Sequence, residues 1–274
     1  MSAKYTQEVI GIARQAGAAI MEVYRSSDMG ETSKADNSPL TLADLAAHQT
    51  IVEALTRLSP DIPILFEEAA DISYAQRSQW KRFWLVYPLD GTKEFIRCNG
   101  EFTVNIALVE NGEPVMGVVY APVPDVCYYG THGAGAYVQR DNAAAQPIKV
   151  KLHVAGEPVK VVASRSHSDA RTAALLEQLG EHQCISMGSS LKLCLVAEGA
   201  AHFYPRLGLT MEWDTAAAHA VVNAAGGTVC SKEGKELSYN KADLHNPEFL
   251  VLPTKDEILF RRLKFCGYDM SVTH

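Results

Sequence analysis

Apolar residues recur at helical spacing near the start of the chain. The first such run covers about residues 5 to 25 and predicts one amphipathic helix. A second run begins after a polar loop, where Thr41 is a suitable N-cap, and ends at Ser59-Pro60. The apolar positions are Val9, Ile12, Ala13, Ala16, Ile20 and Val23 in the first run, and Leu45, Ile51, Val52, Leu55 and Leu58 in the second. Two helices are therefore expected before the first sheet.

From Ile62 onward the pattern changes to short apolar runs separated by Gly, Pro and Asn. The runs read "IPILF", "FWLVY", "FTVNIALVENGEPVMGVVYAP" and "VCYYGTHGAGAYV". Asn111-Gly112 divides the longest run, and this dipeptide between two strand-like segments is typical of a β-hairpin turn. The first half of the chain is therefore predicted to be α+β, with two helices packed on an antiparallel sheet.

Residues 139–158 are polar and weakly patterned, and they are expected to lead into a second region. Beyond them, strand-like and helical segments alternate as far as "DTAAAHAVVNAAGG", which favours a smaller α/β region. We therefore expect two regions, residues 1–155 and residues 156–274.

Composition narrows the class of protein. The chain has 274 residues, 47% of them hydrophobic, and a net charge of −7, so an ordinary globular protein is expected and binding to a nucleic-acid polymer is not. Six cysteines without any CxxC pair argue against a zinc site or a disulfide framework and favour a reducing compartment. The N-terminal run is broken by charges and resembles neither a signal peptide nor a spanning helix, so a soluble cytoplasmic protein is expected.

Acidic residues mark several breaks between the predicted elements. Glu67 and Glu68 follow "IPILF", Asp90 follows "FWLVY", and Asp214 stands at a helix start. Each alone has an ordinary interpretation as a solvated acid or an N-cap. Together they favour a divalent cation such as Mg²⁺, which takes oxygen ligands from turns of this kind. We expect Glu67, Asp90 and Asp214 to lie within reach of one cation.

A second candidate pair is Asp44 with Thr92. Asp44 is placed to complete a capping box with Thr41. The alternative is catalytic: its carboxylate would polarise the Thr92 hydroxyl, which would orient a water molecule for attack on phosphorus.

Two short segments of the second half combine hydroxyl groups with a base. They are "ASRSH", with Ser164 and His167, and "GSSLK", with Ser189 and Lys192. Hydroxyls, backbone N–H groups and a cation at a helix start suit a phosphate group. Short serine-rich turns are common, however, and His167 and Arg206 could equally be surface residues.

Six motifs together resemble the inositol monophosphatase family of Mg²⁺-dependent, lithium-sensitive phosphatases. "PLDGTKEF" and "EWDTAAAHAVVNAAGG" look like the paired signature of that family. "SKADNSPLTLAD", "ASRSHSD", "GSSLKLCLVAEG" and "YPRLG" resemble its branch of 3'(2'),5'-bisphosphate nucleotidases. The resemblance extends over about residues 5 to 250.

The resemblance implies a layered αβαβα fold and hydrolysis of adenosine 3',5'-bisphosphate to AMP and phosphate, a step that serves sulfate assimilation. It also implies two or three Mg²⁺ ions, a monomer or homodimer, and no membrane-spanning segment, with peripheral membrane association left open. The implied metal ligands are Glu67, the Leu89 carbonyl, Asp90 and Asp214, and Asp44 and Thr92 are the implied water-activating pair. The implied substrate-binding residues are Gly91, Thr92, Ser164, His167, Ser189, Lys192 and Arg206.

The chain departs from the family pattern at two positions. The turn in the family usually reads Asp-Pro-Leu-Asp-Gly-Thr, and here its first acid, a metal ligand, is replaced by Tyr87. The family favours a small serine where this chain has Phe66. Loss of a carboxylate implies weaker metal binding and reduced activity. Two alternatives stay open: a nucleotide-binding pseudoenzyme, and a phosphatase of inositol phosphates or of fructose 1,6-bisphosphate.

Overall fold

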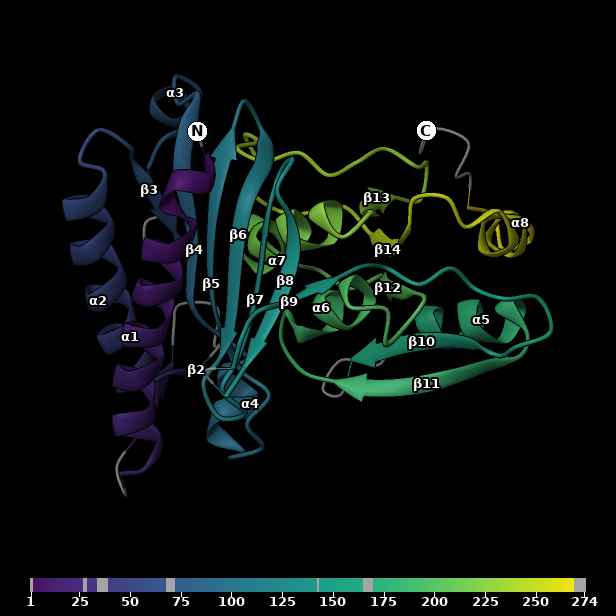
Figure 1. Cartoon of the computed structure of the whole chain (residues 1–274), viewed down its shortest axis with the longest axis horizontal. Helices are drawn as coiled ribbons and strands as arrows, with labels where there is room; N and C mark the ends of the chain where they lie inside the picture. Colours follow the sequence, from purple (N-terminus) through teal and green to yellow (C-terminus); the bar gives the residue numbers. More distant parts are fainter. Residues whose placement is uncertain are drawn as a thin grey trace.

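The fold is described from a computed structural model of the chain. The structure describes residues 2–26, 29–33, 39–67, 72–141, 143–164 and 170–268. Its elements follow one another as stacked layers, with helices outside and between two regions of sheet (Figure 1).

Two long helices form the first layer, as the apolar spacing predicts. They are α1 (Thr6–Tyr24) and α2 (Leu42–Leu58). Their apolar faces pack on one face of the large sheet in a core that includes Trp84, Ile106 and Val118. Before α1 lies the 3₁₀ helix η1 (Ser2–Tyr5), and between the two helices lies the antiparallel pair β1 (Thr32–Ser33) and β2 (Pro39–Leu40).

The second layer is a seven-stranded sheet of order β3-β4-β5-β6-β7-β8-β9. Its strands β3 and β4 are parallel, and the remaining neighbours are antiparallel. Short helices α3 (Tyr74–Arg77) and α4 (Thr92–Ile96) lie on either side of β4 in sequence. The strands are β3 (Ile64–Phe66), β4 (Arg82–Asp90), β5 (Thr103–Glu110), β6 (Glu113–Ala121), β7 (Val126–Thr131), β8 (Gly135–Arg140) and β9 (Gln146–Ile148).

Helices α6 (Leu191–Ala197) and α7 (Glu212–Ala224) cover the opposite face of this sheet. Glycines in two strands permit a close approach of α7. A Cβ on Gly117 of β6 would lie 2.0 Å from the Ala217 carbonyl oxygen, and one on Gly130 of β7 would lie 2.8 Å from the Val221 Cα. Because no other residue type fits these contacts, the glycines fix the position of α7, and with it the position of Asp214.

The remaining layers form the smaller region. Strand β10 (Val159–Ser164) pairs in parallel with β11 (His182–Met187), and the antiparallel sheet β12-β14-β13 contains β12 (Tyr204–Arg206), β14 (Phe249–Pro253) and β13 (Gly227–Ser231). A bridge between Val161 and Phe203 joins the two sheets. Helices α5 (Ala170–Leu179) and α8 (Glu257–Phe265) cover the outer face through a separate apolar core. The order of layers is therefore αβαβα, as expected.

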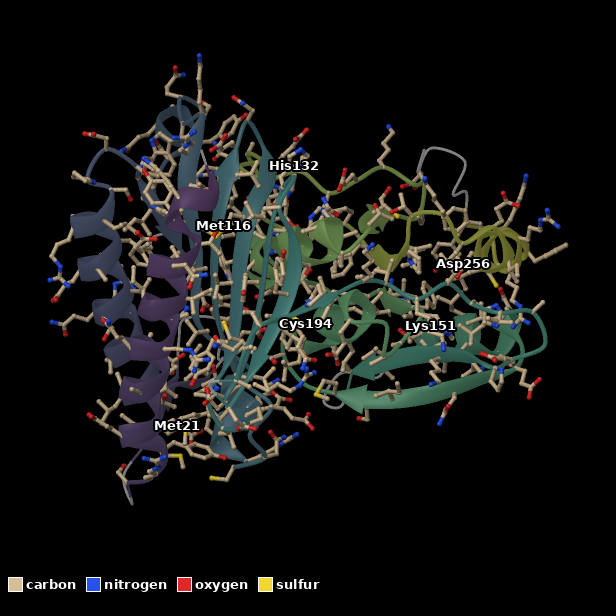
Figure 2. All side chains as sticks on the ribbon, viewed as in Figure 1. Met21, Met116, His132, Lys151, Cys194 and Asp256 are labelled. Atoms are coloured by element: carbon tan, nitrogen blue, oxygen red, sulfur yellow. The ribbon has the colours of Figure 1, made fainter. Side chains whose placement is uncertain are left out.

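Figure 2 shows that side chains fill the space on both sides of the large sheet. Met116 belongs to the core beneath α1 and α2, and Cys194 belongs to the core on the α6 and α7 side. All six cysteines, each within the described ranges, are free thiols. In the part of the chain that the structure describes, no helix is long and apolar enough to cross a membrane.

The hairpin prediction is confirmed, because Asn111 and Gly112 join β5 to β6 with φ angles of 53° and 85°. One helical prediction is wrong: Leu45, assigned to the buried face of α2, is 50% exposed because it lies on the outer side of the helix. The division at residue 155 stays a prediction. Helix α7 comes from the second region in sequence but packs on the sheet of the first.

Gly117→Ala should test the contact between α7 and β6. The added methyl group meets backbone atoms of Ala217, which cannot rotate away, so we expect a loss of about 1 to 3 kcal/mol in the free energy of unfolding. Urea unfolding measures it. Gly11→Ala is the matched control, because no described atom beyond its chain neighbours and its own helix backbone lies within 4 Å of its added Cβ. A helical Gly→Ala change of this kind should stabilise by up to about 1 kcal/mol. Equal effects of the two changes would contradict the proposed packing.

Candidate active site

A β-bulge ends strand β4 and directs Asp90. Tyr87 pairs with Asn105 and Asp90 with Thr103, so Pro88 and Leu89 together face a single residue of β5. Proline suits this place because it cannot donate a ladder hydrogen bond. Gly91 follows at a φ of 93°, a conformation that L side chains rarely adopt, and α4 begins at Thr92. The turn thus carries Tyr87, Asp90 and Thr92 to one place.

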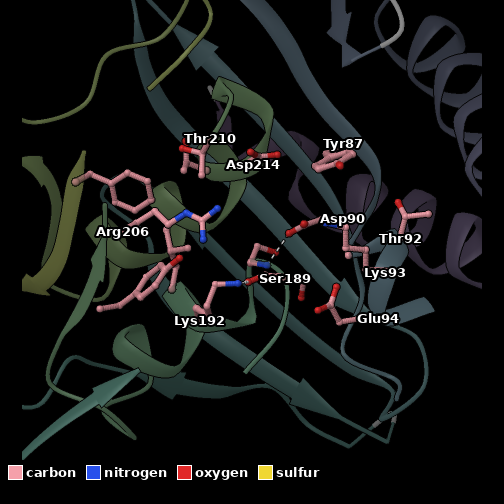
Figure 3. Close-up of a pocket in the computed structure, with 16 residues that line it drawn as sticks. Tyr87, Asp90, Thr92, Lys93, Glu94, Ser189, Lys192, Arg206, Thr210 and Asp214 are labelled. Atoms are coloured by element: carbon pink, nitrogen blue, oxygen red, sulfur yellow. Dashed lines mark hydrogen bonds between the residues drawn. The ribbon is translucent and has the colours of Figure 1, made fainter. Parts of the chain in front are cut away.

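A pocket of about 250 Å³ opens at this turn. Residues of both predicted regions line it: Tyr87, Asp90 and Thr92 come from the first, and Lys192 and Asp214 come from the second. Figure 3 shows Tyr87, Asp90 and Thr92 on one side of the pocket and Arg206 and Lys192 on the other, with Asp214 between them. The first side therefore carries the carboxylates of Asp90 and Glu94 together with Lys93, and the second side carries the cations Lys192 and Arg206.

Tyr87 lies among the acids that the sequence singled out. Burial raises the pKa of its phenol well above the usual value, and the nearby carboxylates of Asp214, Glu67, Asp90 and Asp44 raise it further. The phenol is therefore neutral at ordinary pH. Its ring occupies space among four carboxylates and supplies no negative charge to them.

The pKa values of Asp214 and Asp90 are also raised. Burial and the neighbouring Asp90 raise the pKa of Asp214 to about 7, and burial raises the pKa of Asp90 despite the opposing effects of Lys192 and of the Ser190 N–H group. Each accepts one backbone hydrogen bond: Asp214 from Met211 at 2.8 Å and Asp90 from Ser190 at 2.6 Å. These half-buried acids lack enough positive charge nearby to offset their mutual repulsion and burial.

The stricter expectation, that Glu67, Asp90 and Asp214 lie within reach of one cation, stays a prediction, because these acids do not stand as a ready three-ligand group. Among the described residues, no three His, Cys, Asp or Glu side chains are grouped closely enough to hold a metal ion as they stand. The physical reason is that like charges repel, while backbone N–H groups bind one oxygen each of Asp90 and Asp214 and the Tyr87 ring lies among the acids.

The capping interpretation of Asp44 is confirmed. Its Oδ2 accepts hydrogen bonds from the Thr41 N–H at 2.8 Å and from the Thr41 hydroxyl at 2.7 Å. Asp44 nevertheless faces the site, since it raises the pKa of Tyr87. Thr92 is buried and lines the pocket, so the catalytic pairing of Asp44 and Thr92 stays a prediction.

The basic side of the pocket is built by β12 and the start of α6. Lys192 is buried, which lowers its pKa, and its Nζ donates a hydrogen bond to the Ser189 carbonyl at 2.6 Å. Arg206 donates to the Leu209 carbonyl, and its buried Nε has no hydrogen-bond partner among the described residues. Ser189 adopts a φ of 46°, which turns the chain sharply between β11 and α6. Two cations and an unsatisfied donor suit an anionic ligand.

The other predicted residues are placed less completely. Glu67 directly follows β3 and lies close enough to Tyr87 to raise its pKa, whereas Glu68 and His167 lie outside the described residues. Ser164 ends β10. The Leu89 side chain is fully buried and has no donor atom, so only the backbone carbonyl of this residue could bind a metal ion.

Phe66 has a partner that the sequence did not suggest. Its ring packs against the His48 ring of α2, with centroids 4.2 Å apart. Tyr204 is a further pocket residue that was not predicted from the sequence. Its ring lines the pocket, with Lys192 Nζ lying 5.8 Å from the ring centroid. Tyr204 is the first residue of the motif "YPRLG", and its place in that motif was the only signal available.

The donor set fits a hard divalent cation. Asp90 and Asp214 offer carboxylate oxygens only, both with raised pKa values that a positive charge would lower. Both side chains are partly exposed to the pocket rather than sealed. The residues present therefore suit Mg²⁺ better than a soft metal ion, with Tyr87 as the one misfit.

Comparison with known proteins agrees with this geometry. The profile of the Inositol monophosphatase family matches residues 2–266. The chain is 51% identical to the 3'(2'),5'-bisphosphate nucleotidase CysQ of Escherichia coli over 246 residues, which cover 89% of this chain and 98% of that protein. It is also 51% identical to CysQ of Salmonella typhimurium over 247 residues, with the same two shares.

A solved structure of another family member has the same fold. The crystal structure of CysQ from Bacteroides thetaiotaomicron, a bacterial member of the inositol monophosphatase family, matches with a TM-score of 0.78 at 44% identity, covering 89% of this chain and 95% of that one. The fold and the site thus define a layered, metal-dependent phosphatase. The chain belongs to the inositol monophosphatase family.

Asp214→Asn should stabilise the protein when EDTA removes metal ions. At pH 8 the Asp214 carboxyl is ionised in both states, and because its folded pKa is raised to about 7, its charge is disfavoured in the folded protein. One pKa unit is worth about 1.4 kcal/mol, so we expect a gain of at least about 1 kcal/mol in the free energy of unfolding. Asp125→Asn is the control, since Asp125 is paired with Arg14 and its loss should destabilise. A destabilised Asp214→Asn variant would contradict this account.

Proposed function

We propose that this chain is a Mg²⁺-dependent 3'(2'),5'-bisphosphate nucleotidase that hydrolyses adenosine 3',5'-bisphosphate to AMP and phosphate. About half-identity to CysQ nucleotidases over 98% of their length supports this function. The observation that carries it within the structure is the polarity of the pocket, with carboxylates on one side and Lys192 and Arg206 on the other. A substrate with two phosphate groups can use both sides.

The acidic side would hold the metal and the phosphate that is removed. Glu67, the Leu89 carbonyl, Asp90 and Asp214 are the proposed ligands. Mg²⁺ bound there would neutralise the phosphate and polarise the attacking water. Asp44 would accept a proton through the Thr92 hydroxyl, which orients the water. The number of ions, two or three, stays a prediction.

The basic side would hold the phosphate that does not react. Lys192 and Arg206 supply charge for this phosphate, while Gly91 and Thr92 are proposed to contact the reacting phosphate on the opposite side. Ser164, His167 and Ser189 are proposed to complete the nucleotide site. This arrangement favours a nucleotide bisphosphate over an inositol monophosphate. The similarity to CysQ nucleotidases supports a role in sulfur metabolism. Its cytoplasmic location and its state as a monomer or homodimer stay predictions.

Tyr87 is proposed to weaken metal binding. The neutral phenol among the carboxylates supports weaker metal binding, and the comparisons lend no support to reduced activity. A nucleotide-binding pseudoenzyme is the alternative that the same observation favours. Release of phosphate from a panel of adenosine 3',5'-bisphosphate, inositol 1-phosphate and fructose 1,6-bisphosphate, with and without Mg²⁺, separates these functions.

Tyr87→Asp should raise Mg²⁺ affinity and kcat together. The change returns a hard anionic ligand to the site. Phe66 precedes Glu67 directly and packs on His48, so full recovery is expected only in the double variant with Phe66→Ser. The measurement is kcat against Mg²⁺ concentration for the unchanged chain, both single variants and the double variant. If the unchanged chain already matches the double variant, Tyr87 does not impair the site.

Lys192→Ala should raise KM for adenosine 3',5'-bisphosphate about 10-fold or more, because a charge-assisted hydrogen bond is worth about 1.5 to 3 kcal/mol. The KM for a small phosphomonoester should change much less. Lys235→Ala is the matched control, since Lys235 is exposed and lies outside this pocket. Equal losses on both substrates would refute the role of Lys192 in binding the second phosphate.

A further inference from the structure

Three buried polar side chains form a closed ring of hydrogen bonds next to the pocket. The Thr103 and Ser190 hydroxyl oxygens lie 2.8 Å apart, the Ser190 hydroxyl donates to Asn105 Oδ1 at 2.7 Å, and Asn105 Nδ2 donates to Thr103 Oγ1 at 3.3 Å. All three residues are at most 2% exposed. We call Thr103, Asn105 and Ser190 the polar ring.

The available hydrogen atoms fix which group donates and which accepts in each of the three hydrogen bonds. The Ser190 hydrogen goes to Asn105 Oδ1, so Ser190 must accept from Thr103, and Thr103 must accept from Asn105. Each hydroxyl therefore donates once and accepts once within the ring. Buried networks of this kind are rigid when complete and costly when one member is missing.

The polar ring connects two parts of the chain that are far apart in sequence. Thr103 and Asn105 belong to β5 of the large sheet, and Ser190 precedes α6 of the second region. The pairing register places Thr103 opposite Asp90 and Asn105 opposite Tyr87. The polar ring therefore lies beside Asp90, a proposed metal ligand, and Tyr87, which stands where the family has another acid.

Ser190 connects the polar ring to Asp90 through its backbone N–H group. Its backbone N–H donates to Asp90 Oδ2 at 2.6 Å, a short bond to a carboxylate. The hydroxyl of the same residue is fixed by Thr103 and Asn105, so the N–H has little freedom to turn away. With one lone pair of Oδ2 bound in this way, the carboxylate keeps a fixed orientation in which Oδ1 has no backbone hydrogen bond of this kind to compete with a cation.

We infer that Thr103, Asn105 and Ser190 are positioning residues, which hold Asp90 through the Ser190 amide and so set its orientation toward the metal. The inference rests on the proposed function for the identity of the metal. The same ring fixes to the large sheet the segment that contains Ser189 and, one turn of helix later, Lys192. The metal site and the phosphate-binding side are therefore held in one geometry by a single set of hydrogen bonds.

Thr103→Val tests the inference, because it keeps the size of the side chain and removes one member of the ring. Two quantities are measured: the hydrogen-exchange rate of the Ser190 amide in metal-free protein, and the apparent Kd for Mg²⁺ from the rise of Tm with Mg²⁺ concentration. We expect exchange at least about 10-fold faster and, as for other residues that orient metal ligands, a Kd about 10-fold higher. Thr103→Ser keeps the hydroxyl and should restore both values.

Thr131→Val is the matched control. Thr131 is also a buried threonine of the large sheet, and its hydroxyl bonds to that of Thr6 at 3.1 Å, away from the pocket. It should lower overall stability without changing the Ser190 amide or the Mg²⁺ affinity.

Two results would overturn parts of the inference separately. Unchanged exchange of the Ser190 amide in Thr103→Val, or an equal change in Thr131→Val, refutes the positioning role of the ring. Released exchange with an unchanged Kd for Mg²⁺ shows that Asp90 is not the metal-binding acid, which refutes the ligand assignment in the proposed function. The amide measurement needs no metal, so it decides the role of the ring even for a chain that binds no Mg²⁺.

Discussion

The collection of several carboxylates at one partly buried place is the constraint on which this structure depends. Asp90 raises the pKa of Asp214, and both carboxylates, together with those of Glu67 and Asp44, raise the pKa of the buried Tyr87 phenol. Such an arrangement opposes folding unless positive charge or hydrogen bonds offset it. Backbone N–H groups offset part of it, and a bound divalent cation would offset the rest. The site is therefore a place where stability is given up for chemistry.

Holding the acids together requires strong packing elsewhere. Helix α7 carries Asp214 and lies directly on the large sheet, at a distance that only Gly117 and Gly130 allow. Two apolar cores, one on each face of that sheet, hold its strands in place. The polar ring then fixes the second region against β5. Rigid surroundings of this kind are what keep like charges close together.

Tyr87 and Phe66 change the character of this place without disturbing the fold around it. Phe66 packs on His48, and Tyr87 stays within the register of β4 and β5. Both aromatic residues thus have ordinary structural partners. The protein therefore accommodates these substitutions structurally, and any effect they have falls on charge and metal coordination.

Local patterns in the sequence determined most of the elements. Helical spacing predicted α1 and α2, the Asn111-Gly112 pair predicted the hairpin, and the alternation after residue 155 predicted the smaller region. The family motifs pointed to the acids and the bases of the pocket, because these residues directly follow predicted strands and can be recognised from short segments of sequence. Leu45 was misplaced, since helical spacing gives a face only approximately.

Only the tertiary structure decided how these residues meet. It placed α7 on the sheet of the first region, gave Asp44 its capping bonds, and joined Thr103 and Asn105 to Ser190 across 87 and 85 positions of the chain. It also showed that the carboxylates surround a neutral phenol and do not form a ready three-acid group among the described residues. Side-chain spacing along one strand or helix is fixed by backbone geometry and can be read from sequence. Distances between elements depend on packing of the whole core, which no single segment encodes.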